Sequence, residues 1–186
     1  MRILSGSARG ARLLTDPRSA ARPLMGRARA SLFDILQPRL AAARFLDLFA
    51  GFGSVGLEAV SRGARLAVLV ERDPQAAALI RRNIEKLRFG DRAELRQSDV
   101  FRALDSLAQV QTQFDLVFAG PPYGRKLARA TLAAPALPQV LAAGGLAVVQ
   151  HDRRDDPGDH PGPFRRLRLE RYGDTLLSFY AAASAP

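Results

Sequence analysis

The 186-residue sequence contains no cysteine, and this absence excludes several kinds of protein at once. Without thiols there is no disulfide framework, no thiolate-bound zinc, no iron–sulfur cluster and no cysteine nucleophile. The two histidines, His151 and His160, are too few for a centre built from imidazole ligands, so we expect no metal. A secreted protein stabilised by disulfides is excluded, and a reducing compartment is compatible with the composition.

Long apolar runs are missing as well. The amino terminus reaches Arg9 and Arg12 before the apolar core of a signal peptide has formed, so we expect a cytoplasmic protein. The apolar region at 127–149 is interrupted by two prolines and by Gly144-Gly145, which excludes a single membrane-spanning helix. With 47% hydrophobic and 25% charged residues, the chain has the profile of one globular domain, with or without an arm.

Positive charge is in excess. Lys and Arg number 28 against 18 Asp and Glu, which gives a net charge of +10. Residues 1–44 hold nine arginines against Asp16 and Asp34, so +7 of this +10 lies in the first quarter of the chain. This balance favours a polyanionic partner bound through its phosphates. A membrane surface attracts the same charges, but residues 16–29 lack a clean amphipathic face, so we expect nucleic acid and no membrane.

From residue 45 onward, short apolar runs alternate with helical patterns, which indicates a parallel sheet covered by helices on both faces. A tight Gly173-Asp174 turn near the end predicts an antiparallel edge hairpin. The fold class is therefore α/β, a doubly wound, mostly parallel sheet whose ligands bind outside the carboxyl ends of its strands. We predict strands at 45–49, 66–70, 93–97, 114–119, 146–150, 164–172 and 175–181, and helices at 54–62, 74–87, 101–107 and 126–141.

The first part of the chain has a different character. Residues 2–4 and 11–15 are expected to pair as a small hairpin, and a loop rich in proline and arginine follows up to Pro23. The spacing of apolar residues then predicts a helix at 27–36, ended by Pro38.

A glycine-rich turn follows the first predicted strand of the sheet. Residues 51–56 match the G-x-G-x-x-G pattern of dinucleotide-binding turns. The neighbouring Asp47 argues against NAD, because a carboxylate repels a pyrophosphate but suits the sulfonium and ammonium groups of S-adenosylmethionine. Glu71, 20 residues after Gly51, can hold a ribose diol. Asp99 can face an exocyclic adenine amine, and its alternative role is a helix N-cap.

A rigid loop, Gly120-Pro121-Pro122-Tyr123, follows the fourth predicted strand. It resembles the (Asp/Asn)-Pro-Pro-(Tyr/Phe) motif of amino-directed, S-adenosylmethionine-dependent methyltransferases. Together with segments at 2–6, 22–33 and 172–175, the loop makes the sequence similar to one family in particular, the bacterial small-subunit (16S) ribosomal RNA guanine-N2 methyltransferases of type D. The similarity extends over nearly the whole chain.

The resemblance implies a Rossmann-like class I methyltransferase domain at 41–186 preceded by a basic arm at 1–40. Such an enzyme transfers a methyl group from S-adenosylmethionine to the exocyclic N2 amine of a guanine, and its partner is 16S ribosomal RNA or the small ribosomal subunit; we expect a monomer. The implied cofactor-binding residues are Asp47, Phe49, Ala50, Gly51, Gly53, Glu71, Arg72, Ser98, Asp99 and Val100. The implied catalytic residues are Gly120, Pro121, Pro122 and Tyr123, with Tyr123 stacking on the base. The expected RNA phosphate contacts are Arg9, Arg12, Arg22, Arg27 and Arg29.

The sequence departs from the family pattern where the motif begins. The family carries there a side chain that accepts the hydrogens of the target amine, and this chain has Gly120; Gly26 and Ala30 replace two acids of the arm. Loss of a positioned polar group lowers a rate by about 10²- to 10⁴-fold, although the carbonyl of Pro121 can accept an amine hydrogen. Three interpretations remain open: an active enzyme that relies on backbone acceptors, a weak or inactive RNA-binding or ribosome-assembly protein, and an amino methyltransferase with another nucleic-acid target.

Overall fold

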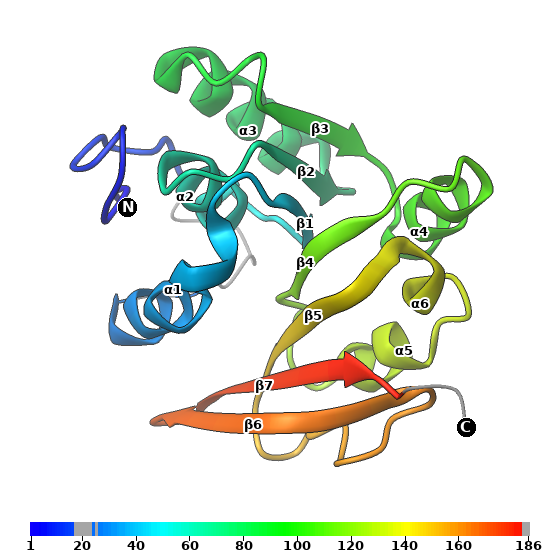
Figure 1. The fold of residues 1–186 in the computed structure, drawn as a ribbon. Helices are drawn as coiled ribbons and strands as arrows, with labels where there is room; N and C mark the ends of the chain where they lie inside the picture. Colours follow the sequence, from blue (N-terminus) through cyan, green and yellow to red (C-terminus); the bar gives the residue numbers. More distant parts are fainter. Residues whose placement is uncertain (17–23, 25, 184–186) are drawn as a thin grey trace.

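The computed structural model of the protein describes residues 1–16, 24 and 26–183. Its strands are β1 (Arg44–Leu48), β2 (Leu66–Glu71), β3 (Ala93–Gln97), β4 (Phe114–Ala119), β5 (Leu141–His151), β6 (Phe164–Tyr172) and β7 (Thr175–Ala182). They form one sheet in the order β3-β2-β1-β4-β5-β7-β6 (Figure 1). The strands from β3 to β5 pair in parallel, and β7 runs antiparallel to both β5 and β6. This topology confirms the predicted α/β fold with its antiparallel edge pair.

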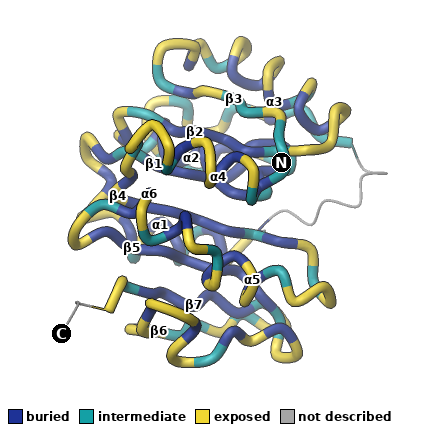
Figure 2. The backbone as a smooth tube through the Cα atoms, turned by 90° about the vertical axis from the view of Figure 1, so that its right-hand side faces the viewer, coloured by how far each residue is buried: buried dark blue, intermediate teal, exposed yellow. Residues whose placement is uncertain are grey.

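Helices cover both faces of the sheet. One hydrophobic cluster includes α1 (Gly26–Leu40), α2 (Ser54–Ser61) and α3 (Pro74–Leu87), and a second includes α4 (Val100–Gln109), α5 (Leu127–Ala133) and α6 (Leu137–Val140). Because successive strand residues point to opposite faces, Phe45 belongs to the first cluster and Leu46 to the second. The central strands are accordingly buried along most of their length (Figure 2). Among the described residues, no helix has the length and hydropathy needed to cross a membrane.

Two helix predictions are wrong, and proline explains both. Helix α1 continues past Pro38 to Leu40, because a proline in the last turn removes only one hydrogen bond and Leu40 is fully buried. The single helix expected at 126–141 is instead α5, α6 and the start of β5. Ala134 precedes Pro135 and adopts an extended conformation with φ −65° and ψ 124°, as the steric demand of the proline ring favours.

The amino-terminal segment is docked on the rest of the protein. The expected hairpin is present as one antiparallel bridge between Arg2 and Arg12, next to a bond from Ile3 N to Ala11 O at 3.0 Å. The side chains of Ile3 and Leu13 are buried in the same cluster as α1, α2 and α3. The described residues of 1–40 therefore share their core with the sheet, and among them no separate core marks a boundary at residue 40.

A buried carboxylate on α2 fastens this segment. Glu58 has no exposed surface, and it accepts hydrogen bonds from Leu4 N at 2.7 Å and from Ser5 N at 3.0 Å. It also pairs with Arg62, whose Nε lies 2.8 Å from Glu58 Oε1. On α3, Asn83 accepts a bond from Leu14 N at 2.7 Å. Side chains of two helices thus satisfy backbone groups that have no strand partner.

Replacing Glu58 by alanine should destabilise the fold by about 3 kcal/mol, because two backbone donors and a cation lose a buried partner. Chemical denaturation measures the loss, and hydrogen exchange should speed up at Leu4 and Ser5. Glu94→Ala is the matched control, since it removes an exposed pair with Arg96 and should cost under about 1 kcal/mol. Unchanged exchange at Leu4 and Ser5 in Glu58→Ala would contradict this anchoring role.

Candidate cofactor and target-base site

A cavity of about 720 Å³ opens at the carboxyl edge of the sheet, within the size range of small-molecule sites. The ends of β1, β2 and β4, and the turn before α4, supply its walls. It contains most of the predicted cofactor and catalytic residues, namely Asp47, Phe49, Ala50, Gly51, Glu71, Arg72, Asp99, Val100, Gly120, Pro121 and Pro122. Segments far apart in the sequence therefore meet at one place, as the parallel topology predicts.

Asp47 is the most deeply buried acid of this cavity, with 1% of its surface exposed. Its Oδ2 accepts a hydrogen bond from Gly56 N at 2.8 Å, across the glycine-rich turn. The pKa of Asp47 is raised to about 7: burial raises it, the Gly56 N–H lowers it in part, and the charge of Glu71 adds to the rise. A cationic ligand group beside Asp47 would favour its ionised form.

The turn after β1 is built from left-handed backbone. Phe49, Gly51 and Gly53 have φ values of 62°, 57° and 80°, and Phe49 adopts a conformation that costs a side-chain-bearing residue energy. Glu71 holds this turn, because its Oε2 accepts from Gly51 N at 2.8 Å and its Oε1 accepts from Asp73 N at 2.9 Å. A carboxylate has about four acceptor sites, so Glu71 retains capacity for ribose hydroxyls.

Asp99 serves as the N-cap of α4, the alternative role considered for it. Its Oδ1 accepts from Phe101 N at 2.9 Å and from Arg102 N at 3.4 Å. Since Asp99 also lines the cavity, the cap orients a carboxylate that a ligand can reach.

Two predicted cofactor residues do not line the cavity. Gly53 is the N-cap of α2, and a Cβ there would lie 3.0 Å from Leu69 and 3.1 Å from Leu57. Ser98 donates from its hydroxyl to Asp99 O at 3.1 Å. Both residues shape the backbone around the site rather than its surface.

The proline loop continues the pairing of β4 with β1, through a bond from Gly120 N to Leu48 O at 3.2 Å. Pro121 is buried and Pro122 is exposed at the cavity. Tyr123 is half-buried and lines a second cavity of about 710 Å³, whose other walls come from the start of α1 and the β6–β7 turn. The Tyr123 hydroxyl lies 3.3 Å from Thr175 Oγ1.

Gln150, which the sequence analysis does not single out, lies between the two cavities and lines both. It stands near the end of β5, is 4% exposed, and donates from Nε2 to the Tyr123 hydroxyl at 2.8 Å. A Cβ added at Gly120 would lie 3.3 Å from Gln150 Oε1. One feature of the sequence could have identified Gln150. It is a polar residue near the end of an apolar strand, at the sheet edge that also holds Asp47.

The predicted RNA-contacting arginines have different environments. Arg9, Arg12 and Arg27 are exposed, and Arg27 also lines the second cavity, whereas Arg22 lies outside the described residues. The expectation for Arg29 is wrong: it faces the core side of α1, is 3% exposed, and donates from Nη2 to Arg2 O at 2.6 Å. Burial lowers the pKa of Arg29, and its role is to hold the amino-terminal segment.

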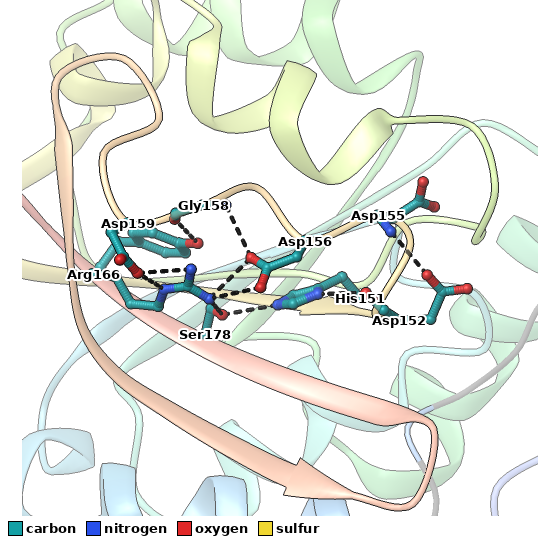
Figure 3. Close-up of polar contacts among 9 residues, drawn as sticks. His151, Asp152, Asp155, Asp156, Gly158, Asp159, Arg166 and Ser178 are labelled. Carbon is teal, nitrogen blue, oxygen red and sulfur yellow. Dashed lines mark hydrogen bonds and ion pairs between the residues drawn. The ribbon is translucent and has the colours of Figure 1, made fainter.

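The polar loop at 152–163 is fixed to the edge strands by a network of hydrogen bonds and ion pairs around the buried His151 (Figure 3). His151 has no exposed surface; its Nε2 lies 2.8 Å from Ser178 Oγ and its Nδ1 2.8 Å from Asp152 O. Burial lowers the pKa of His151, which favours the neutral ring at pH 7. Arg166 of β6 pairs with Asp156 at 2.9 Å, so the loop is anchored to β6 and β7.

The same loop also contacts the proline loop. Asp155 is 9% exposed, and its Oδ2 accepts a hydrogen bond from Gly124 N. Asp155 N in turn donates to Asp152 Oδ1 at 2.9 Å. The structure thus assigns the 152–163 loop a bracing role beside the site.

The donor set of the first cavity fits S-adenosylmethionine. Asp47 is a buried carboxylate suited to a cation, Glu71 lines the cavity at the end of β2, and Asp99 lines it beside the apolar Val100. This site and the mostly parallel sheet with its antiparallel edge pair define a methyltransferase with a Rossmann-like fold, whose cofactor is S-adenosylmethionine.

The family model described as Conserved hypothetical protein 95 matches residues 1–181, and the chain belongs to that family. Ribosomal RNA small subunit methyltransferase D of Haemophilus influenzae is 35% identical over 184 residues, covering 97% of this chain and 93% of that protein. These matches confirm the resemblance to the type D family.

Solved structures show the same fold along the whole chain. The Escherichia coli protein yhhF has a TM-score of 0.86 at 29% identity, and the match covers 100% of this chain and 99% of that one. The Thermus thermophilus protein TTHA0928 has a TM-score of 0.82 at 35% identity, covering 96% and 98%.

Cofactor affinity should depend on the protonation of Asp47. Because its pKa is raised to about 7, a cationic ligand must displace a proton at lower pH, so affinity should rise about fivefold from pH 6 to pH 7. Calorimetric titration with S-adenosylmethionine measures this rise, together with proton release below pH 7. Asp47→Asn should bind more weakly with a flatter profile, and the exposed Asp115→Asn should behave like the unmodified protein. The same pH profile in Asp47→Asn would rule out Asp47 as the titrating group.

Proposed function

We propose that the protein transfers a methyl group from S-adenosylmethionine to the N2 amine of a guanine in small-subunit ribosomal RNA. This proposal rests mainly on one observation: two cavities meet at the proline loop. Pro121 and Pro122 line the cofactor cavity, Tyr123 lines the second cavity, and Gln150 lines both. The relative from Haemophilus influenzae is named for small-subunit ribosomal RNA, which supports the choice of substrate.

The cofactor cavity orients one reactant. Asp47 and Glu71 hold the cationic and ribose parts, and Asp99 holds the adenine amine. Bound S-adenosylmethionine supplies an electrophilic methyl group on its sulfonium. Burial of Asp47 at 1% exposure strengthens its attraction for a cation, because the local dielectric constant is low.

The second cavity receives the other reactant. A guanine amine inside a helix is out of reach, so the target base must be unstacked and turned into the site. Tyr123, half-buried and tied to Gln150 and Thr175 through its hydroxyl, offers an aromatic face for stacking. Arg27 lines the same cavity and suits a flanking phosphate.

The proline loop then aligns the amine. A guanine N2 is a weak nucleophile because its lone pair is delocalised into the ring. Hydrogen bonds from the amine to fixed acceptors, such as the Pro121 carbonyl, localise that pair and aim it at the methyl carbon. A new N–C bond forms while the C–S pair stays on sulfur, and the surplus proton on nitrogen leaves to water.

Incubation with unmethylated small ribosomal subunits and radiolabelled S-adenosylmethionine should place label in N2-methylguanosine after nucleoside analysis. Glu71→Ala should lower this transfer at limiting cofactor, because the glycine-rich turn loses its anchor. The exposed Glu94→Ala is the control and should keep full activity. Label in another nucleoside would contradict the guanine assignment; no label, with cofactor binding intact, would favour the RNA-binding alternative that Gly120 suggests.

Exposed arginines should set the salt dependence of RNA binding. Neutralising Arg9, Arg12 or Arg27 singly should weaken binding and reduce the slope of log K against log salt by about one unit. Filter binding of small-subunit RNA at several salt concentrations measures both the affinity and this slope. Arg102→Ala is the control, because Arg102 is exposed on α4 across the sheet from the amino-terminal segment. Slopes unchanged in all three variants would separate these residues from RNA binding.

A further inference from the structure

We propose that the side-chain oxygen of Gln150 accepts a hydrogen of the target amine, in place of the side chain that Gly120 lacks. This inference rests on the proposed function and names the acceptor at its centre. Gln150 comes from β5 and Gly120 from the end of β4, so the acceptor has moved to the neighbouring strand.

The side-chain amide of Gln150 lies with its nitrogen toward Tyr123 and its oxygen toward Gly120. Nε2 donates to the Tyr123 hydroxyl at 2.8 Å, on the side of the second cavity. The other end, Oε1, points toward Gly120, 3.3 Å from the place where a Cβ would stand. Within the described part of the chain, the hydrogen bond of this side chain is made through its nitrogen, so its oxygen remains an acceptor at the cavity junction.

Gly120 and Gln150 fit each other sterically. A Cβ at position 120 would come within 3.1 Å of Phe118 Cε1 as well as 3.3 Å of Gln150 Oε1, so one of these neighbours would have to give way. Gly120 does not have a positive φ, so its backbone does not require glycine. The oxygen of Gln150 thus lies directly beside the space that a side chain at 120 would enter.

Gln150 is held firmly enough to orient a substrate. It is 4% exposed and pairs with Leu177 in the β5–β7 ladder. The next residue, His151, is locked by Ser178 and Asp152. An acceptor on a rigid strand keeps its position without loop movement, which is what alignment of a weak nucleophile requires.

The chemistry needs an acceptor rather than a base. The Gln150 oxygen accepts one amine N–H and stabilises the positive charge that grows on nitrogen as the N–C bond forms. A neutral amide does not retain the proton, which leaves to water after the C–S pair has passed to sulfur. Gln150 therefore acts by orientation and electrostatics.

Variants at 150 test this role through methyl transfer to unmethylated small subunits. Gln150→Leu should lower the single-turnover rate about 100-fold, whereas Gln150→Glu, which keeps an acceptor, should stay within about 10-fold. Adding Gly120→Asn to Gln150→Leu should restore part of the lost rate. Gln113→Leu is the matched control, because Gln113 is exposed outside both cavities and should leave the rate unchanged.

A binding measurement tests the same contact without catalysis. Inosine monophosphate lacks only the 2-amino group of guanosine monophosphate, so in the presence of S-adenosylhomocysteine the protein should bind the guanosine form a few-fold more tightly. Ligand-observed NMR or calorimetry measures both. The preference should disappear in Gln150→Leu and persist in Gln150→Glu and Gln113→Leu.

The outcomes separate the two proposals. An active protein whose rate and guanosine preference survive Gln150→Leu would overturn the role of Gln150 and leave the proposed function standing. A protein that binds cofactor but methylates no guanine would overturn the proposed function, and with it the role of Gln150. Loss of methyl transfer in both Gln150→Leu and Gln150→Glu, without rescue by Gly120→Asn, would also contradict the acceptor role.

Discussion

The parallel pairing of β1 with β2 and β4 is the constraint on which the site depends. In this register Asp47 lies beside Leu69 and Phe118, so β2 and β4 end at the same edge where the β1 carboxylate is buried. Glu71 and the loop that begins at Gly120 then follow their strands directly into the cavity. A shift of one residue in either ladder would turn Asp47 to the opposite face of the sheet.

Local signals predicted most of the elements. The bounds of α3, β3, β4 and β6 agree with the sequence, because apolar runs end at clear caps and turns, such as Asp73 before Pro74. That Asp47, Glu71 and Asp99 line one cavity was also predictable, since acids at successive strand ends must meet in a parallel sheet. The burial of Arg29 was not predictable, because a charged residue on a helix is expected at the surface, and only the structure shows that the amino-terminal segment covers it. The role of Gln150 was not predictable either. A single polar residue near the end of an apolar strand indicates a function only when the structure places it beside Gly120.

The charge distribution separates two kinds of ligand. The protein carries a net charge of +10, yet its cofactor cavity contains the carboxylates of Asp47, Glu71 and Asp99. Exposed arginines suit an anionic partner at the surface, while the acids of the cavity favour a cationic cofactor and repel phosphates. A basic exterior around an acidic cavity thus directs each reactant to its own place.

The contacts of the 152–163 loop affect how a substrate can enter the site. Asp155 accepts a hydrogen bond from Gly124, next to the proline loop, and the His151 network ties the 152–163 loop to β7, so hydrogen bonds link the proline loop to the end of β5. We therefore expect little hinge motion between these two elements. Under the proposed function, the distortion that brings a base into place then falls mainly on the nucleic acid, so we expect targets that are already unpaired or weakly stacked to be methylated most easily.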